Sequence, residues 1–215
     1  MASTETRATR TADASCVDLV DADGRKARRN RNKVRVADAF LDLVREGATH
    51  PSVADVAERS GVSHRSVFRY FADRDEMTRT SIERQHSRLD PILHRRIDPI
   101  QALADRVDQV IDHRLELFEE IAATARLTRS LARRQPMLQT ELTATRSRLR
   151  VGLKRLFAAE FATMPPSIAA DTLATLDVLL SFESVELLRH DQMLSHARSA
   201  RVLRRATIAL LGATE

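Results

Sequence analysis

Residues 50–77 of the chain read HPSVADVAERSGVSHRSVFRYFADRDEM, and this stretch decides the fold. Ser52 is suited to cap a helix that starts at the next residue, because its hydroxyl can accept a backbone N–H of the first turn. Gly61 follows that helix, where glycine readily takes the positive φ angle that many helix ends require. Ser63 offers a second cap, so the spacing predicts another short helix over residues 64–70. Two short capped helices joined by a glycine turn form a helix-turn-helix pattern.

The apolar residues of these two helices are spaced so that each helix buries one face. In the first helix, Val53, Val56 and Ala57 fall at i, i+3 and i+4. In the second helix, Val67 and Phe71 point inward. The outer face of the second helix is then polar and cationic, and it consists of His64, Arg65, Ser66 and Arg69.

The segment resembles the DNA-binding signature of TetR-type transcriptional regulators. The positions that carry the resemblance are Ala57, Gly61, Val62, Ser63, Phe71 and the cation Arg74. One position departs from the family pattern, because Phe68 stands where the family usually has a tyrosine that bonds a phosphate. Whether Tyr70 takes over that contact is left open. The resemblance covers this segment and the helix before it, and the rest of the chain matches the family in length and helical character.

The resemblance implies an all-α fold, in which an N-terminal three-helix helix-turn-helix DNA-binding domain precedes a helical-bundle domain for ligand binding and dimerisation. We expect a disordered tail over residues 1–27, the DNA-binding domain over 28–76 and the helical domain over 77–215. The implied function is that of a homodimeric repressor that a small hydrophobic ligand releases from its operator. Repression and activation both stay open, because the sequence does not encode where the operator lies.

Composition agrees with a helical, soluble protein. The 215 residues include only five glycines and six prolines, which favours long helices over many short strands. Charged residues make up 30% and hydrophobic residues 43%. The formal net charge of +5 permits binding to a polyanion. Cys16 is the only cysteine, and the N-terminus is polar. No apolar run approaches the roughly 20 residues that span a bilayer, so we expect a cytoplasmic protein.

Residues 25–35 read RKARRNRNKVR, with seven cations and no acid. The run directly precedes the first helix of the DNA-binding domain, which we expect over about 33–46. An arm in this position can follow phosphates or enter the minor groove, and the candidate contacts are Arg28, Arg29 and Arg31. The alternative is an ordinary solvated charge run.

Further helices are expected downstream. Asp73 is suited to cap a fourth helix, from about Arg74 to Leu89. The spacing then predicts helices over about 100–123, 126–134, 136–161, 166–189 and 192–211. The helix over 166–189 is apolar on nearly all sides and must be covered on several of them. A second copy that packs its last two helices there would complete the cover, whereas a monomer would hold both helices in its own core.

The helical domain has residues that suit a pocket for a hydrophobic or amphipathic ligand. The candidate lining residues are His113, Phe118, Met137, Phe157, Phe161, Phe182 and Glu183, with Met164 as a further apolar side chain and with Arg114 and Glu186 as further polar groups. The alternative for each of them is an ordinary place in the core or on the surface.

The candidate DNA contacts follow from the motif, the resemblance and the basic run. They are Ser52, Ser63, His64, Arg65, Ser66, Arg69, Tyr70, Arg74, Arg28, Arg29 and Arg31. The expected partners are a pseudo-palindromic double-stranded operator, a second copy of the chain and a small effector, with no membrane. The common enzyme motifs do not occur in the sequence, so we expect neither catalysis nor a cofactor or metal. The alternatives are a DNA-binding regulator without an inducer, and a helical small-molecule-binding protein or enzyme that retains the head.

Overall fold

A computed structural model of the protein describes residues 12–49, 51–93 and 95–212. Within these residues the chain forms helices and connecting turns without a strand, which confirms the all-α prediction. The contacts separate two compact units, Met1–Arg88 (unit 1) and Leu89–Glu215 (unit 2). This division falls inside a helix, whereas the sequence-based boundary lies at residue 76, and the sequence-based domain ranges stay a prediction.

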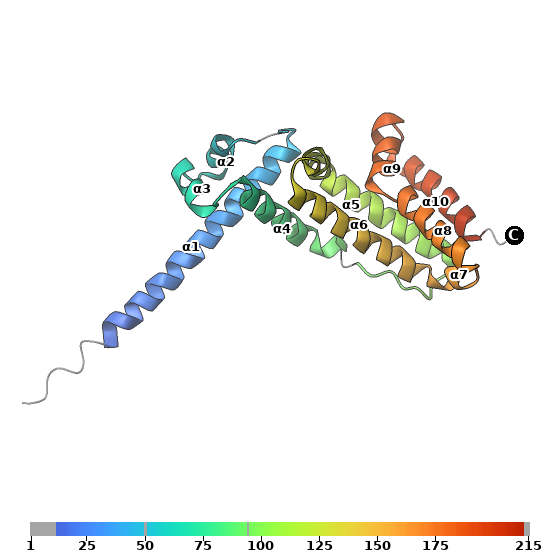
Figure 1. Ribbon diagram of the computed structural model, residues 1–215, viewed down its shortest axis with the longest axis horizontal. Helices are drawn as coiled ribbons and strands as arrows, with labels where there is room; N and C mark the ends of the chain where they lie inside the picture. Colours follow the sequence, from blue (N-terminus) through green and yellow to red (C-terminus); the bar gives the residue numbers. More distant parts are fainter. Residues whose placement is uncertain (1–11, 50, 94, 213–215) are drawn as a thin grey trace, which may run out of the picture. The chain divides into compact units, whose positions relative to one another are not determined.

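Unit 1 contains α1 (Ala12–Arg45), α2 (Val53–Ser60), α3 (His64–Tyr70) and most of α4 (Arg74–Leu93). The starts of α2, α3 and α4 agree with the sequence-based helices, and α3 has the predicted bounds. α2 and α3 both pack against α1 and against each other. Figure 1 shows them beside the C-terminal part of α1, while the N-terminal part of α1 extends past them.

Helix α1 begins at Ala12 rather than near Lys33, so residues 12–27 differ from the predicted tail. The physical reason is that no proline precedes Pro51 and that Gly24 is the only glycine before Gly47. Once packing fixes the C-terminal half of α1, each further turn adds hydrogen bonds without a new nucleation cost. Residues 1–11 of the predicted tail lie outside the described residues.

Of the apolar residues predicted to face inward on α2 and α3, Val56, Val67 and Phe71 are buried, and Val53 and Ala57 are half-buried. Phe40, Leu41 and Val44 of α1 and Val62 of the turn complete the core of unit 1. Ion pairs fasten the helices around this core. Arg84 Nε lies 2.7 Å from Asp38 Oδ1, which joins α4 to α1. Arg59 donates two hydrogen bonds to the carboxylate of Glu46, which joins α2 to the end of α1.

Unit 2 is a helical bundle in which α5 packs against α6 and α10, and α8 packs against the same two helices. Its elements are α5 (Leu103–Ala132), α6 (Pro136–Leu156), α7 (Ala158–Ala162), α8 (Pro166–Leu179), α9 (Phe182–Glu186), the π-helical turn η1 (Leu187–Asp191) and α10 (His196–Gly212).

The helix predicted over 192–211 starts at His196, and three larger differences concern the helices before it. The two helices predicted over 100–123 and 126–134 form one helix, α5, because nothing between them breaks a helix. The helix predicted over 166–189 stops at Leu179, because the Ser181 hydroxyl accepts the Ser184 N–H and starts a new helix. The helix predicted over 136–161 ends at Leu156 and is followed by α7.

Candidate nucleic-acid interface

The turn between α2 and α3 is held by the predicted caps. The Ser52 hydroxyl accepts the Asp55 N–H at 3.1 Å, and the Ser52 N–H donates to the Asp55 carboxylate at 2.8 Å. These bonds lower the pKa of Asp55. Gly61 has a φ of 64°, the left-handed conformation that favours glycine. Arg35 Nη2 donates to the carbonyl of Ser60 at 2.7 Å, so α1 also contacts and stabilises the turn.

Helix α3 is fixed on both of its sides. Val67 and Phe71 are 2% and 3% exposed and face the core, as predicted. On the outer side, the Ser63 hydroxyl caps the helix by accepting the Ser66 N–H at 3.3 Å, and it donates to the Ser66 hydroxyl at 3.0 Å. A helix held in this way presents its remaining side chains in fixed directions.

The exposed side of α3 is cationic. His64, Arg65, Phe68 and Arg69 are all exposed, and the helix contains no acid. Arg69 Nη2 lies 3.4 Å from the half-buried Ser66 hydroxyl, at the long end of the hydrogen-bond range. The structure therefore brings the predicted contacts His64, Arg65 and Arg69 together on one accessible surface. The predicted contact Ser66 is half-buried beside them.

The prediction that Tyr70 contacts DNA is corrected by its place in the structure. Tyr70 is 8% exposed, and its hydroxyl accepts a hydrogen bond from Asn32 Nδ2 at 3.0 Å. This bond, followed by contact with Arg69, lowers the pKa of Tyr70. The hydroxyl is therefore engaged inside unit 1, and we leave Tyr70 out of the proposed contact surface.

The other candidate contacts of unit 1 are exposed. Ser52 and Ser63 lie at the starts of α2 and α3, and Arg74 is the first residue of α4, where Asp73 Oδ1 accepts the Glu76 N–H at 2.7 Å. On α1, Arg28, Arg29 and Arg31 are all exposed. Arg28 and Arg31 share a face because they are three residues apart, whereas Arg29 points elsewhere.

Three aromatic pocket candidates of unit 2, Phe118, Phe157 and Phe182, are buried in its core. The rings of Phe118 and Phe182 meet edge to face at 5.7 Å between centroids, and both are buried. Phe157 is fully buried, with the Arg106 guanidinium 5.7 Å from its centroid. Met137, Phe161 and Met164 are half-buried. The structure thus brings Phe118 and Phe182 into contact and places Phe157 under a separate arginine.

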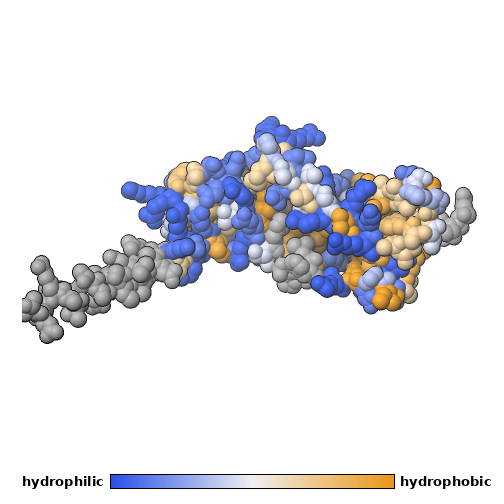
Figure 2. All heavy atoms as spheres, turned by 60° about the horizontal axis from the view of Figure 1, so that its bottom comes forward, coloured by the Kyte–Doolittle hydropathy of each residue, from blue (hydrophilic) through white to orange (hydrophobic). Residues whose placement is uncertain are grey.

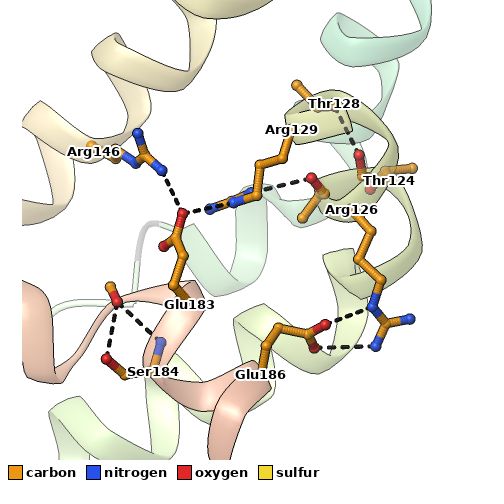
Figure 3. A network of polar contacts seen from close by, with 10 residues as sticks. Thr124, Arg126, Thr128, Arg129, Arg146, Glu183, Ser184 and Glu186 are labelled. Carbon is orange, nitrogen blue, oxygen red and sulfur yellow. Dashed lines mark hydrogen bonds and ion pairs between the residues drawn. The ribbon is translucent and has the colours of Figure 1, made fainter. Parts of the chain in front are cut away.

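The polar pocket candidates are engaged with protein partners. His113 Nε2 lies 2.7 Å from the carbonyl of Ile92, and burial lowers the pKa of His113. Glu183 accepts hydrogen bonds from Arg129 Nε at 2.9 Å and from Arg146, as Figure 3 shows. Partial burial acts to raise the pKa of Glu183. The hydrogen bonds and the charge of the arginines outweigh this effect and lower the pKa to about 2. Glu183 therefore ties α9 to α5 and α6.

The sequence analysis did not predict the exposure of Phe68 or the burial of Arg114. Phe68 is 60% exposed on the cationic side of α3. Arg114 is 4% exposed in the core of unit 2, and burial lowers its pKa to about 10. The signal for Arg114 was present, since it falls on the apolar stripe of Val107, Ile111 and Phe118. The apolar spacing gives no signal for the exposure of Phe68, because an aromatic residue in a short helix is usually buried. The one signal was its position where the resembled family usually has a phosphate-bonding tyrosine.

Neither a membrane-spanning helix nor a metal-binding cluster occurs in the described part of the chain. No helix there is long and apolar enough to cross a membrane. No group of three or more His, Cys, Asp or Glu side chains there is arranged to hold a metal ion.

Comparison with known proteins identifies the fold. No family model matches the sequence, and no curated protein matches it. A solved structure from a Rhodococcus species, described as a TetR-family transcriptional regulator, is similar with a TM-score of 0.62 and 17% identity, over 85% of this chain and 99% of that chain. A second, described as a transcriptional regulator from Streptomyces coelicolor A3(2), has a TM-score of 0.57 and 22% identity, over 82% and 98% of the two chains. At these identities the likeness shows the fold.

Proposed function

We propose that this chain, whose fold is that of a TetR-family regulator, is a transcriptional regulator that binds duplex DNA through α3. The observation that carries the proposal is the exposed surface of α3, which holds His64, Arg65 and Arg69 without an acid in the helix. Cationic side chains on a capped helix after a glycine turn are suited to the major groove. The likeness of the fold to solved regulators supports the same conclusion.

The side chains of unit 1 would divide the work between bases and phosphates. Arg65 and Arg69 can each reach guanine O6 and N7 through two hydrogen bonds. Ser52, Ser63 and Arg74 would set the position of the motif on phosphates. Arg28 and Arg31, on one side of α1, would add an affinity that depends on salt and tolerates any sequence.

We propose that the active form is a homodimer joined through α8 and α10. On α8, Ile168 and Val178 are 51% and 68% exposed and lie on one side with Asp171. On α10, Val202 is 41% exposed beside exposed Arg205. Figure 2 shows apolar surface over the end of unit 2 that holds α7, α8 and α10. Burying apolar side chains between copies favours association, and Asp171 and Arg205 supply opposite charges. A dimer would place two α3 helices on two half-sites.

We propose further that unit 2 takes an amphipathic, anionic effector. Arg114 supports this, because its Nη2 donates to the carbonyl of Leu149 at 2.9 Å while no described carboxylate forms an ion pair with it. Asp177 attracts it from farther away but lies 3.7 Å from Arg150. A buried cation without an anion is costly, and the ring of Phe118 at 5.9 Å offers an apolar wall. A carboxylate with an apolar tail would match both groups.

The DNA-binding proposal is tested with selection from random duplexes followed by affinity measurements. Wild type should enrich a defined sequence, and replacing Arg65 and Arg69 with Ala should abolish the preference for that sequence while the oligomeric state stays unchanged. Replacing Arg133 and Arg134 with Ala removes the same charge from an exposed part of unit 2 and is the matched control. Enrichment of no sequence, or an equal effect of both double variants, would contradict the proposal.

The effector proposal is tested with decanoate and decanol, which share an apolar chain and differ in charge. Decanoate should raise the melting temperature of unit 2 and lower operator affinity, whereas decanol should do neither to the same extent. Arg114→Met should remove the difference between the two compounds. Equal responses to both, or an unchanged difference in the variant, would favour a regulator without this kind of effector.

A further inference from the structure

Phe68 is the one large apolar side chain of α3 that faces solvent in the structure. It is 60% exposed, whereas Val67, Tyr70 and Phe71 of the same segment are all less than 10% exposed. The ring is also held in place, because His64 one turn earlier meets it edge to face with 4.9 Å between centroids and an angle of 74°. An ordered aromatic ring on a polar surface indicates a contact surface.

The surroundings of Phe68 identify the kind of partner. His64, Phe68, Arg65 and Arg69 follow one another around α3 at steps of about 40–60°, since successive residues in a helix are about 100° apart. The ring therefore lies between a histidine and two arginines, with no acid in the helix. This charge pattern complements a polyanion.

The chemistry of the ring then limits what it can contact on a duplex. Phe68 has no donor or acceptor, so it cannot bond a phosphate oxygen or the polar edge of a base. The apolar group that base pairs present in the major groove is the C5-methyl group of thymine. A ring that lies beside Arg65 and Arg69 on the exposed side of α3 is placed to meet that group.

We propose that Phe68 is a specificity-determining residue that recognises a thymine through its C5-methyl group. This inference rests on the proposed function, because it requires α3 to enter the major groove. It gives the exposed ring a role in recognition. Phe68 then discriminates among base pairs, whereas Arg65 and Arg69 supply hydrogen bonds and charge.

The test uses the duplex that wild type selects from random sequences. Each thymine of one half-site is replaced in turn by uracil, which removes the methyl group and keeps every hydrogen-bonding atom. At one position, uracil should lower wild-type affinity about fourfold, the value of one buried methyl group. Phe68→Ala should bind the thymine duplex more weakly and show no further weakening with uracil at that position. Phe68→Leu, which keeps an apolar side chain, should retain part of the discrimination.

Arg65→Ala is the matched control, since it should weaken binding and leave the ratio between thymine and uracil unchanged. If wild type is indifferent to uracil at every position, or if the ratio persists in Phe68→Ala, the inference is wrong while the proposed function stands. If wild type selects no sequence at all, the proposed function fails and takes the inference with it. Circular dichroism of Phe68→Ala checks that the exposed position has not altered folding.

Discussion

The same substitution at two glycines should change stability in opposite directions. Gly61→Ala places a side chain at a φ of 64°, and the left-handed conformation costs an L-residue about 1–2 kcal/mol. The new Cβ would also lie 3.1 Å from Arg35 Nη2, which bonds the carbonyl of Ser60 at 2.7 Å. Weakening that bond adds up to about 1 kcal/mol. We therefore expect the free energy of unfolding of unit 1 to fall by about 2 kcal/mol.

Gly152→Ala is the matched control inside α6. Apart from its chain neighbours and the backbone of the helix itself, no heavy atom lies within 4 Å of a Cβ added there. Alanine in a helix is about 0.5–1 kcal/mol more favourable than glycine, so this variant should be slightly more stable than wild type. Urea unfolding followed by circular dichroism measures both changes, and hydrogen exchange of the α2 and α3 amides locates the first. Equal stability of Gly61→Ala and wild type, or a comparable destabilisation by Gly152→Ala, would refute the reasoning about the turn.

Three further predictions concern the arm, the interface and pH. Replacing Arg28 and Arg31 with Gln should weaken operator binding. It should also reduce the slope of log affinity against log salt by about 0.9 for each phosphate that the variant no longer neutralises. An unchanged slope would show that these two residues of α1 do not contact DNA. Val178→Asp should shift the protein towards monomer in analytical ultracentrifugation, because it places a charge in the proposed interface. An unchanged dimer would show that α8 lies outside the interface. Because the pKa of Glu183 is lowered from 4.5 to about 2 in the fold, its stabilising contribution is complete above pH 4.5 and disappears as the pH falls towards 2. Glu183→Gln should therefore flatten the dependence of melting temperature on pH in that range, and equal slopes would contradict the role of the network.

The parts of the fold that local chemistry specifies were predictable from the sequence. Ser52, Gly61 and Ser63 fixed the motif, because each satisfies a backbone requirement within three residues of itself. The start of α1 was not predictable in this way, because a charged helix without prolines lacks a signal at its beginning. The break after Leu179 was missed since the apolar pattern continues through it while Ser181 starts a new helix.

The site was predictable in part. The outward direction of Arg65 and Arg69 followed from the positions of Val67 and Phe71. The burial of Tyr70 depends on Asn32, a residue 38 positions earlier, and no local pattern reveals such a partner. The engagement of Glu183 by Arg129 and Arg146 likewise joins three helices that only tertiary packing brings together. Long-range pairs of this kind lie beyond spacing arguments.

The central claim is that α3 lies in the major groove of DNA, and cleavage from a tethered reagent tests it most directly. A variant with Cys16→Ser and Ala72→Cys carries one thiol, two residues past the end of α3 at an exposed position outside the proposed contacts. An iron chelate on that thiol should cut the selected duplex in two clusters about one helical turn, or a multiple of it, apart. The control carries the chelate on α6, in a variant with Cys16→Ser and Arg148→Cys. Absence of localised cleavage, or the same pattern from this control, would contradict the claim.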